Sequence, residues 1–330
     1  MLIEILAVAG GFALLAWSAD RFVVGASALA YNLNISPLII GLTIVSFGTS
    51  APEILVSAIA SLQGNTGLAI GNAIGSNIAN TTLILGITAL AVPLSVKSNI
   101  LHRELPILVL VATVALLLLL DGILGRLDGV ILLSGVVVMM LWMISLARKT
   151  QSQSDAIGNE FAAEIPTDMG VADALFWFVI GALLLLVSSR ILVWGSVSIA
   201  QNLGISDLLI GLTIVALGTS LPELAATLMS AIKKEHDIAL GNIIGSNIFN
   251  LLAVLGLPGL INPGVIDHEV LTRDYPVMFA VILMMFVMAY GFRGPGRINR
   301  LEGAILVICY AAYQTLLYFN TIGAPPPGIR

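Results

Sequence analysis

The sequence has few charged side chains. Asp, Glu, Lys and Arg together make up 10% of its 330 residues, whereas a soluble domain carries about 25%. Hydrophobic residues make up 58%, and the mean hydropathy is +1.04. Several apolar runs reach the roughly 20 residues that a helix needs to cross the hydrocarbon of a bilayer. The composition therefore excludes a soluble domain and predicts a polytopic membrane protein.

Cysteine and histidine are also scarce. Cys309 is the single cysteine, so an internal disulfide is excluded. The three histidines fall in predicted loops or at span ends, and zinc or copper would need imidazole or thiolate ligands. No His-Glu-x-x-His, paired-aspartate or Ser/His arrangement lies inside a predicted span. We therefore expect neither an enzyme nor a cofactor, and the net charge of −5 gives no indication of nucleic-acid binding.

The apolar runs predict an all-α membrane protein with ten transmembrane helices. Five spans fall in a first repeat, 1–147, and five in a second, 171–330, with a polar linker at 148–170. Because each half has an odd number of spans, the two halves enter the membrane in opposite senses, as in many transporters with inverted repeats. The predicted spans are 2–24, 37–62, 67–92, 104–121, 127–147, 172–199, 206–232, 237–262, 273–292 and 299–319.

Lysine and arginine set the predicted orientation. With both termini outside, ten of the 14 basic residues fall in cytoplasmic loops and four fall outside. This arrangement places the linker in the cytoplasm and predicts a multi-pass protein of the cell inner (plasma) membrane. We expect the lipid bilayer and inorganic cations as partners. One chain contains both repeats, so we also expect a functional monomer.

Two polar segments recur at a fixed offset of 170 residues. Residues 38–53 align with 208–223 at 12 identical positions of 16, and 71–80 align with 241–250 at 8 of 10. The first pair contains Gly48-Thr-Ser-Ala-Pro-Glu53 and Gly218-Thr-Ser-Leu-Pro-Glu223. Carboxylates inside a membrane are costly and usually functional, so these segments are the candidate site.

Proline predicts a broken helix in spans two and seven. Pro52 and Pro222 lack an amide hydrogen, so the carbonyls of Gly48 and Gly218 lose their helical donors. We expect the chain to unwind at these glycines, which is tolerated at membrane depth where the backbone is buried in protein or lines a cavity. The Gly-x-x-x-Gly segments of spans three and eight predict close helix contacts.

The polar side chains of both segments offer oxygen ligands. Carboxylates, amides, hydroxyls and carbonyls suit calcium, which takes 6–8 oxygens, and they suit sodium as well. Two ionised glutamates balance one divalent cation and repel each other when it leaves, so sodium ions or protons must replace it. The pattern therefore predicts obligatory exchange and leaves the coupling ion open.

These paired motifs resemble the alpha repeats of the calcium/cation antiporter superfamily, and most closely its prokaryotic sodium/calcium exchangers. The resemblance covers the whole chain and implies a site at the centre of four helices. It implies calcium ligation by Glu53, Asn80, Glu223 and Asn250. It further implies sodium ligation by Ser46, Thr49, Ser50, Glu53, Ser76, Asn80, Ala216, Thr219, Ser220, Glu223, Ser246 and Asn250, with Ser46 and Ala216 acting through their carbonyls.

Three functions compete on this evidence. The first is a Na⁺/Ca²⁺ antiporter that works by alternating access, and the second is a Ca²⁺/H⁺ antiporter on the same scaffold. The hydroxyls of Thr49, Ser50, Thr219 and Ser220 favour sodium. The third is a cation channel, which is disfavoured because carboxylates deep in broken helices favour occlusion over flow.

Overall fold

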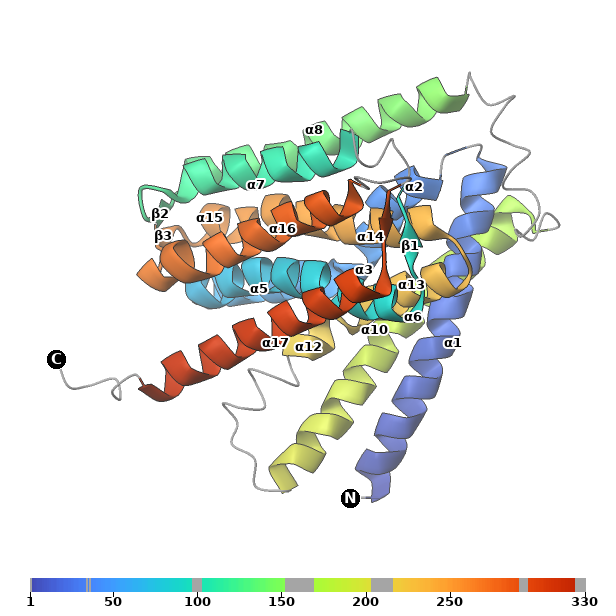
Figure 1. The fold of residues 1–330 in the computed structure, drawn as a ribbon, viewed down its shortest axis with the longest axis horizontal. Coiled ribbons are helices and arrows are strands. Elements are labelled where there is room, and N and C mark those ends of the chain that lie inside the picture. Colours follow the sequence, from blue (N-terminus) through green and yellow to red (C-terminus); the bar gives the residue numbers. More distant parts are fainter. Residues whose placement is uncertain are drawn as a thin grey trace.

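The computed structural model describes residues 2–33, 35, 37–96, 103–151, 169–202, 216–290 and 296–323. These residues form a bundle of helices (Figure 1). Several helices contain wider π-helical turns, labelled η. The first half contains α1 (Leu2–Asn32), α2 (Pro37–Ile40), η1 (Gly41–Val45), α3 (Ser46–Thr49), α4 (Ala51–Leu62), α5 (Thr66–Ala79), η2 (Asn80–Ile84), α6 (Leu85–Ala91), α7 (Leu105–Leu119) and α8 (Arg126–Gln151).

The second half repeats this order. Residues 206–215 of the seventh predicted span lie outside the described residues, as does most of the predicted linker. The elements are α10 (Val171–Asn202), α12 (Ala216–Thr219), α13 (Leu221–Ile232), α14 (His236–Phe249), η5 (Asn250–Val254), α15 (Gly256–Ile261), η6 (Val270–Asp274), α16 (Tyr275–Ala289) and α17 (Arg300–Gly323).

Within the described residues, seven helices are long and apolar enough to cross a membrane, or eight when a bent pair counts as one span. Helical segments lie within each of the ten predicted ranges. The helices α7 and α13 are shorter apolar segments, so the full set of ten spans stays a prediction. The first helix reaches Asn32, well beyond its predicted end at 24.

Two short antiparallel ribbons join the halves. Strand β1 (Leu94–Ser95) pairs with β4 (Arg297–Ile298), and β2 (Ile123–Leu124) pairs with β3 (Gly264–Val265). The 170-residue offset carries β1 onto β3. Each half therefore contributes the equivalent strand to a ribbon whose other strand belongs to the opposite half.

Helix packing between the halves is reciprocal in the same way. The helix α6 packs on α17, where a Cβ added to Gly86 would lie 2.9 Å from the carbonyl of Gly303. The helix α15 packs on α8, where a Cβ added to Gly129 would lie 2.8 Å from the carbonyl of Gly256. Lipid tails give no hydrophobic drive for association, so such small-residue contacts hold membrane helices together.

The helices α1 and α10 lie side by side along much of their length (Figure 1). Glycine permits the close approach, because a Cβ on Gly25 would lie 2.8 Å from the carbonyl of Ala174. The rings of Phe22 and Phe178 stack at 4.9 Å between centroids. The helix α1 also packs on α13, and at the end of α13 Asp20 forms an ion pair with Lys233 at 2.6 Å.

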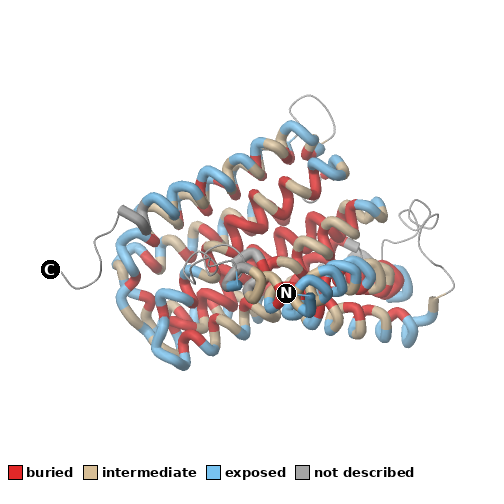
Figure 2. The backbone as a smooth tube through the Cα atoms, turned by 90° about the horizontal axis from the view of Figure 1, so that it is seen from below, coloured by how far each residue is buried: buried red, intermediate tan, exposed pale blue. Residues whose placement is uncertain are grey.

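Burial separates central from peripheral helices (Figure 2). In the segment His236–Ile261, all residues of the most apolar 18-residue window are buried. In Arg300–Phe319, 17% of the residues of such a window are buried. The chain from α14 to α15 therefore forms the centre of the bundle. The exposed side chains of the outer helices are largely apolar, as a lipid-facing surface requires.

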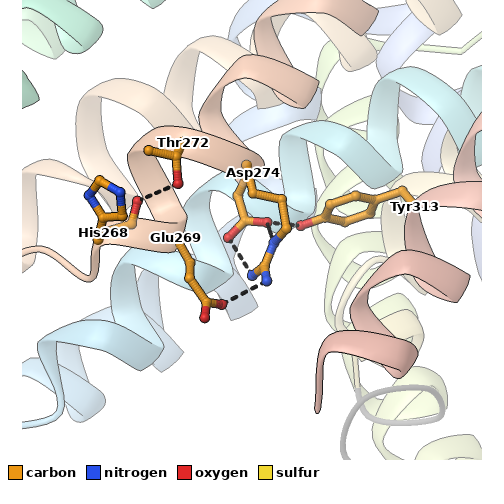
Figure 3. A network of polar contacts seen from close by, with 6 residues as sticks. His268, Glu269, Thr272, Asp274 and Tyr313 are labelled. Carbon is orange, nitrogen blue, oxygen red and sulfur yellow. Dashed lines mark hydrogen bonds and ion pairs between the residues drawn. The ribbon is translucent and has the colours of Figure 1, made fainter. Parts of the chain in front are cut away.

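A polar network anchors the start of α16 (Figure 3). Arg273 donates to Glu269 at 2.7 Å and to Asp274 at 2.8 Å, while the hydroxyl of Tyr313 on α17 donates to Asp274 at 2.9 Å. In the first repeat, Arg103 donates to its neighbour Glu104 at 2.6 Å. This pair matches Arg273 and Asp274 at the 170-residue offset, so the duplication extends beyond the two polar motifs.

Candidate functional site

Both polar motifs interrupt their helices at the serine before the proline. The helix bends by 46° between Leu38–Thr49 and Ala51–Leu62. Ser50 has φ −83° and ψ 5°, and Ser220 has φ −89° and ψ 6°. The prolines occupy the first turn of the following helices α4 and α13, where a missing amide hydrogen is tolerated. The predicted breaks are therefore present beside Pro52 and Pro222.

The helices do not unwind at the glycines of these motifs. Gly48 and Gly218 belong to α3 and α12 and keep helical conformation, contrary to the expectation that the chain opens at glycine. The freed carbonyl of Gly218 instead accepts a hydrogen bond of 2.7 Å from the hydroxyl of Ser189 on α10. Proline removes the donor, and a neighbouring helix supplies a replacement.

The two glutamates lie deep in the protein. Glu53 and Glu223 are 1% and 2% exposed and occupy the first turns of α4 and α13. The hydroxyl of Ser50 donates to Oε1 of Glu223 at 3.1 Å. The break of one repeat therefore contacts the acid of the other, as expected if both breaks face one shared site.

Asparagine side chains fix the backbone beside each glutamate. Asn72 donates to the carbonyl of Glu53 at 3.0 Å, and its repeat partner Asn242 lies 3.4 Å from the carbonyl of Glu223. Asn242 also donates to Thr227 at 2.9 Å and accepts from the hydroxyl of Thr49 at 3.1 Å. Asn72 and Asn242 therefore satisfy backbone carbonyls in a neighbouring helix.

Two other asparagines, Asn77 and Asn247, bond side chains instead of backbone. Asn77 donates to the sulfur of Met278 at 3.5 Å, and Asn247 donates to the hydroxyl of Thr81 at 2.8 Å. Both therefore bond side chains across the bundle instead of freed backbone. The sequence offers no signal that distinguishes these partners, because they lie far away along the chain.

The Gly-x-x-x-Gly segment of the eighth predicted span packs directly on the second. A Cβ added to Gly241 would lie 2.9 Å from the carbonyl of Leu38, and one on Gly245 would lie 2.6 Å from the carbonyl of Leu42. This close contact brings η1 and α3 against α14. The predicted close helix contact is therefore confirmed for the eighth span. For the third span, a Cβ added to Gly71 or Gly75 meets no atom of the described residues within 4 Å.

Asn80 and Asn250 begin matching π-helical turns. The turns η2 and η5 start at these residues and are related by the same 170-residue offset. Both asparagines are buried, at 2% and 1% exposure. The extra residue of a π turn changes the hydrogen-bond ladder locally, and such turns often occur at functional sites. Sequence analysis singled out Asn80 and Asn250 as candidate ligands, but it did not predict the π turns that begin at them.

Several of the predicted ligands carry polar atoms without a hydrogen bond. Leaving a buried polar atom unsatisfied costs about 1–3 kcal/mol, so a concentration of such atoms indicates a missing partner. Oxygen ligands for a cation fit this arrangement. Among the described residues, the buried atoms without a hydrogen-bond partner include Glu53 Oε2, Asn80 Oδ1, Glu223 Oε2, Ser246 Oγ, Asn250 Oδ1 and Asn250 Nδ2.

The other predicted site residues lie on the same elements. Ser76 and Ser246 are buried on α5 and α14, and Ser220 is buried at the second break. Thr219 ends α12, which begins at Ala216. The carbonyl of Ser46 accepts hydrogen bonds from the amide of Ser50 at 2.9 Å and from the hydroxyl of Thr49 at 3.3 Å.

A duplicated helical bundle with buried carboxylates beside broken helices has the architecture of a membrane ion transporter. Comparison with known proteins gives the family. The family model described as "Sodium/calcium exchanger protein" matches residues 3–149 and 174–319. The chain therefore belongs to this family of transporters, within the prokaryotic branch of the calcium/cation antiporter superfamily.

Individual relatives agree with this assignment. The chain is 51% identical to the putative antiporter CaxA of Alkalimonas amylolytica, over 96% of this chain and 99% of the relative. It is 44% identical to the inner membrane protein YrbG of Escherichia coli, over 94% and 95%. A solved structure of the sodium-calcium exchanger NCX_Mj, soaked with Na⁺ and Sr²⁺, matches with a TM-score of 0.80 at 32% identity, over 94% and 97%.

Proposed function

We propose that the protein is an antiporter that exchanges Na⁺ for Ca²⁺ by alternating access. One observation carries the proposal. Among the described residues, Glu53, Asn80, Glu223 and Asn250 each carry a buried oxygen atom without a hydrogen-bond partner. These oxygens lie on the helical segments that follow the breaks at Ser50 and Ser220 and at the starts of the π turns η2 and η5. Oxygen donors of this kind fit a hard cation, and two carboxylates supply the charge that balances one calcium ion.

The calcium ligands we propose are Glu53, Asn80, Glu223 and Asn250. Sodium binding would add Thr49, Ser50, Ser76, Thr219, Ser220 and Ser246, together with the carbonyls of Ser46 and Ala216. The Ser46 carbonyl already accepts two hydrogen bonds, so it would exchange one of them for the ion. Ser50 already contacts Glu223, so sodium ligands from one repeat lie beside an acid of the other.

The charge of the site explains why exchange is obligatory. Glu53 and Glu223 repel each other when ionised, and their burial removes the water that would screen them. A cation relieves this repulsion. If the ion leaves without replacement, the site must carry two negative charges in a medium of low dielectric constant while it changes sides. Exchange with sodium or protons avoids that state.

The proposed architecture is two inverted repeats, 1–147 and 171–330, joined by the linker 148–170. The reciprocal ribbons and the reciprocal contacts between Gly86 and Gly303 and between Gly129 and Gly256 support it. The family model also divides at 149 and 174. Ten spans complete the arrangement, and a single chain then holds the whole site, so we propose a functional monomer.

We further propose that the protein lies in the plasma membrane with both termini outside and the linker in the cytoplasm. The ribbons support this topology. The loops joined by β1 and β4 were both predicted inside from their basic residues, and those joined by β2 and β3 were both predicted outside. The name of the E. coli relative, an inner membrane protein, agrees.

The identity of the coupling ion distinguishes a Na⁺/Ca²⁺ antiporter from a Ca²⁺/H⁺ antiporter. A direct test is ⁴⁵Ca²⁺ uptake into proteoliposomes under an imposed sodium gradient with pH clamped on both sides, and then under a pH gradient without sodium. The proposal requires uptake that follows the sodium gradient. Uptake that follows the pH gradient alone would identify a Ca²⁺/H⁺ antiporter on the same glutamates, and uptake with neither gradient would reject both.

A further inference from the structure

One hydroxyl group holds α10 on the break of the second repeat. Ser189 is 6% exposed, and its Oγ donates to the carbonyl of Gly218 at 2.7 Å. That carbonyl has no helical donor because Pro222 stands four residues later. The hydrogen bond therefore satisfies a buried acceptor close to Glu223, and it links α10 directly to the site.

Within the part of the chain that the structure describes, the first repeat shows no equivalent hydrogen bond. The 170-residue offset places Gly48 opposite Gly218 and Pro52 opposite Pro222. It places Ala19, which is 1% exposed, opposite Ser189. An alanine cannot donate, so the two repeats share the proline that frees a carbonyl and differ in the side chain that can satisfy it.

The packing is also tighter at the break of the second repeat than at the break of the first. A Cβ added to Gly218 would collide with the side chain of Val193 on α10. Among the described residues, a Cβ added to Gly48 meets just the ring of Phe22, at 4.0 Å. A small gap lies beside Gly48, lined by Phe22, Gly48, Thr49, Ala182, Leu185, Leu186 and Pro222.

The two repeats are thus alike in sequence and unlike in packing. In this structure α10 is docked on the break of the second repeat, while α1 is not docked in that way on the break of the first. Inverted repeats of this kind can exchange their arrangements, and the exchange changes which side of the membrane reaches the site. The opposite state would bring α1 onto Gly48 and release α10 from Gly218.

We propose that Ser189 is a positioning residue that biases the access equilibrium toward the arrangement with α10 docked on Gly218. The inference deepens the proposed antiport function and rests on it. The Ser189–Gly218 bond exists in one state, and Ala19 offers no matching bond in the other. A single neutral hydrogen bond shifts a two-state equilibrium about fivefold.

The ratio of apparent calcium affinities at the two membrane faces measures this equilibrium. The apparent affinity at each face is proportional to the fraction of molecules open to that face, so it falls as that fraction falls. The ratio of the two half-saturating Ca²⁺ concentrations therefore changes by the same factor as the access equilibrium. A purely structural loss would reduce the amount of active protein and leave the ratio unchanged.

The experiment compares sodium-driven calcium exchange in right-side-out and inverted membrane vesicles. Ser189→Ala should change the ratio about fivefold. Ala19→Ser should change it in the same direction, because a hydroxyl offered to Gly48 would stabilise the opposite state. Ser189→Thr keeps the hydroxyl and should restore the wild-type ratio. The matched control is Ser188→Ala, because the Ser188 hydroxyl bonds the carbonyl of Leu185 within its own helix, at 3.0 Å.

The outcomes separate this inference from the proposed function. An unchanged ratio in active Ser189→Ala and Ala19→Ser proteins overturns the positioning role and leaves antiport intact. A shift of the same size in Ser188→Ala also overturns it, because the effect would not require the Gly218 carbonyl. If Ser189→Ala fails to fold, Ala19→Ser still decides the result. A wild-type protein that moves no calcium overturns the antiport function and the inference together.

Discussion

The hydroxyl of Ser50 in the first repeat donates a hydrogen bond of 3.1 Å to the carboxylate of Glu223 in the second. These residues are 173 positions apart in the chain and belong to breaks that follow one sequence pattern. The contact shows that the two broken helices meet at one place. A cation bound there would contact both halves of the protein, so movement of one half against the other could transfer it across the membrane.

Neutralising either central acid should abolish calcium exchange. Glu53→Gln and Glu223→Gln each remove one of the two charges that balance a divalent ion while preserving side-chain volume. We expect uptake to fall by about 100-fold or more, because removing one buried charge partner typically costs 3–5 kcal/mol. The measurement is ⁴⁵Ca²⁺ uptake in proteoliposomes. The matched control is Glu269→Gln, because the Glu269 side chain is 71% exposed. Wild-type uptake rates in the Glu53 variant would show that Glu53 is not a ligand of the proposed site.

Adding charge at Asn250 should strengthen calcium binding. Asn250→Asp places a third carboxylate where both polar atoms of the amide lack a partner among the described residues. At short range in a protein interior the added attraction is several kcal/mol before desolvation, so we expect affinity to rise about tenfold or more. Calorimetry with Ca²⁺ on purified protein measures it.

The control for Asn250 is Asn247→Asp, since the Asn247 amide already donates to Thr81. That change breaks a structural hydrogen bond and should not improve binding. Equal gains in both variants would show a general effect of negative charge, and the ligand role of Asn250 would then be wrong.

Removing the Ser50 hydroxyl should weaken sodium binding more than calcium binding. Ser50→Ala deletes a proposed sodium ligand and a hydrogen bond to a carboxylate, and bonds to charged groups contribute about 1.5–3 kcal/mol. We expect the half-saturating sodium concentration to rise about tenfold. Ser61→Ala is the control, because Ser61 bonds the carbonyl of Ser57 in its own helix. A sodium dependence identical to wild type would argue against direct ligation.

Asn242 and Asn72 should differ in their effect on stability. They are repeat partners, but Asn242 bonds Thr49, Thr227 and the Glu223 carbonyl. Among the described residues, the side chain of Asn72 bonds the Glu53 carbonyl alone. Asn242→Ala should therefore destabilise the protein by about 2–3 kcal/mol and Asn72→Ala by about 1 kcal/mol. Thermal unfolding in detergent, followed by fluorescence, compares the two. Equal losses would mean that the extra bonds of Asn242 contribute nothing.

The ion pair between Asp20 and Lys233 should matter little for folding. Both side chains are about one-third exposed, at 33% and 30%, and exposed pairs contribute up to about 1 kcal/mol. Lys233→Gln should lower the unfolding temperature slightly, and high salt should remove most of the difference. A large loss that persists in high salt would show that the pair is screened from solvent and stabilises the docking of α1 on α13.

Much of this architecture follows from the sequence because the chain repeats itself. The 170-residue offset identified the paired breaks, and the prolines placed them to within two residues of Ser50 and Ser220. Apolar length placed the helices, since a membrane admits few alternatives to a helix with satisfied backbone. The π turns at Asn80 and Asn250 could not be predicted, because they depend on how neighbouring helices pack and not on a local residue pattern.

The sequence by itself determined the class of protein, the position of each break and the residues that could bind a cation, because backbone chemistry and membrane thickness act locally along the chain. The tertiary structure decided which side chains meet. It brought Ser50 to Glu223 and set Ser189 against Gly218, while Ala19 cannot form a matching bond. Among the described residues, it gave Asn242 three partners and Asn72 one. Two nearly identical segments acquire different neighbours because the helices around them pack differently, and that difference is absent from the repeat itself.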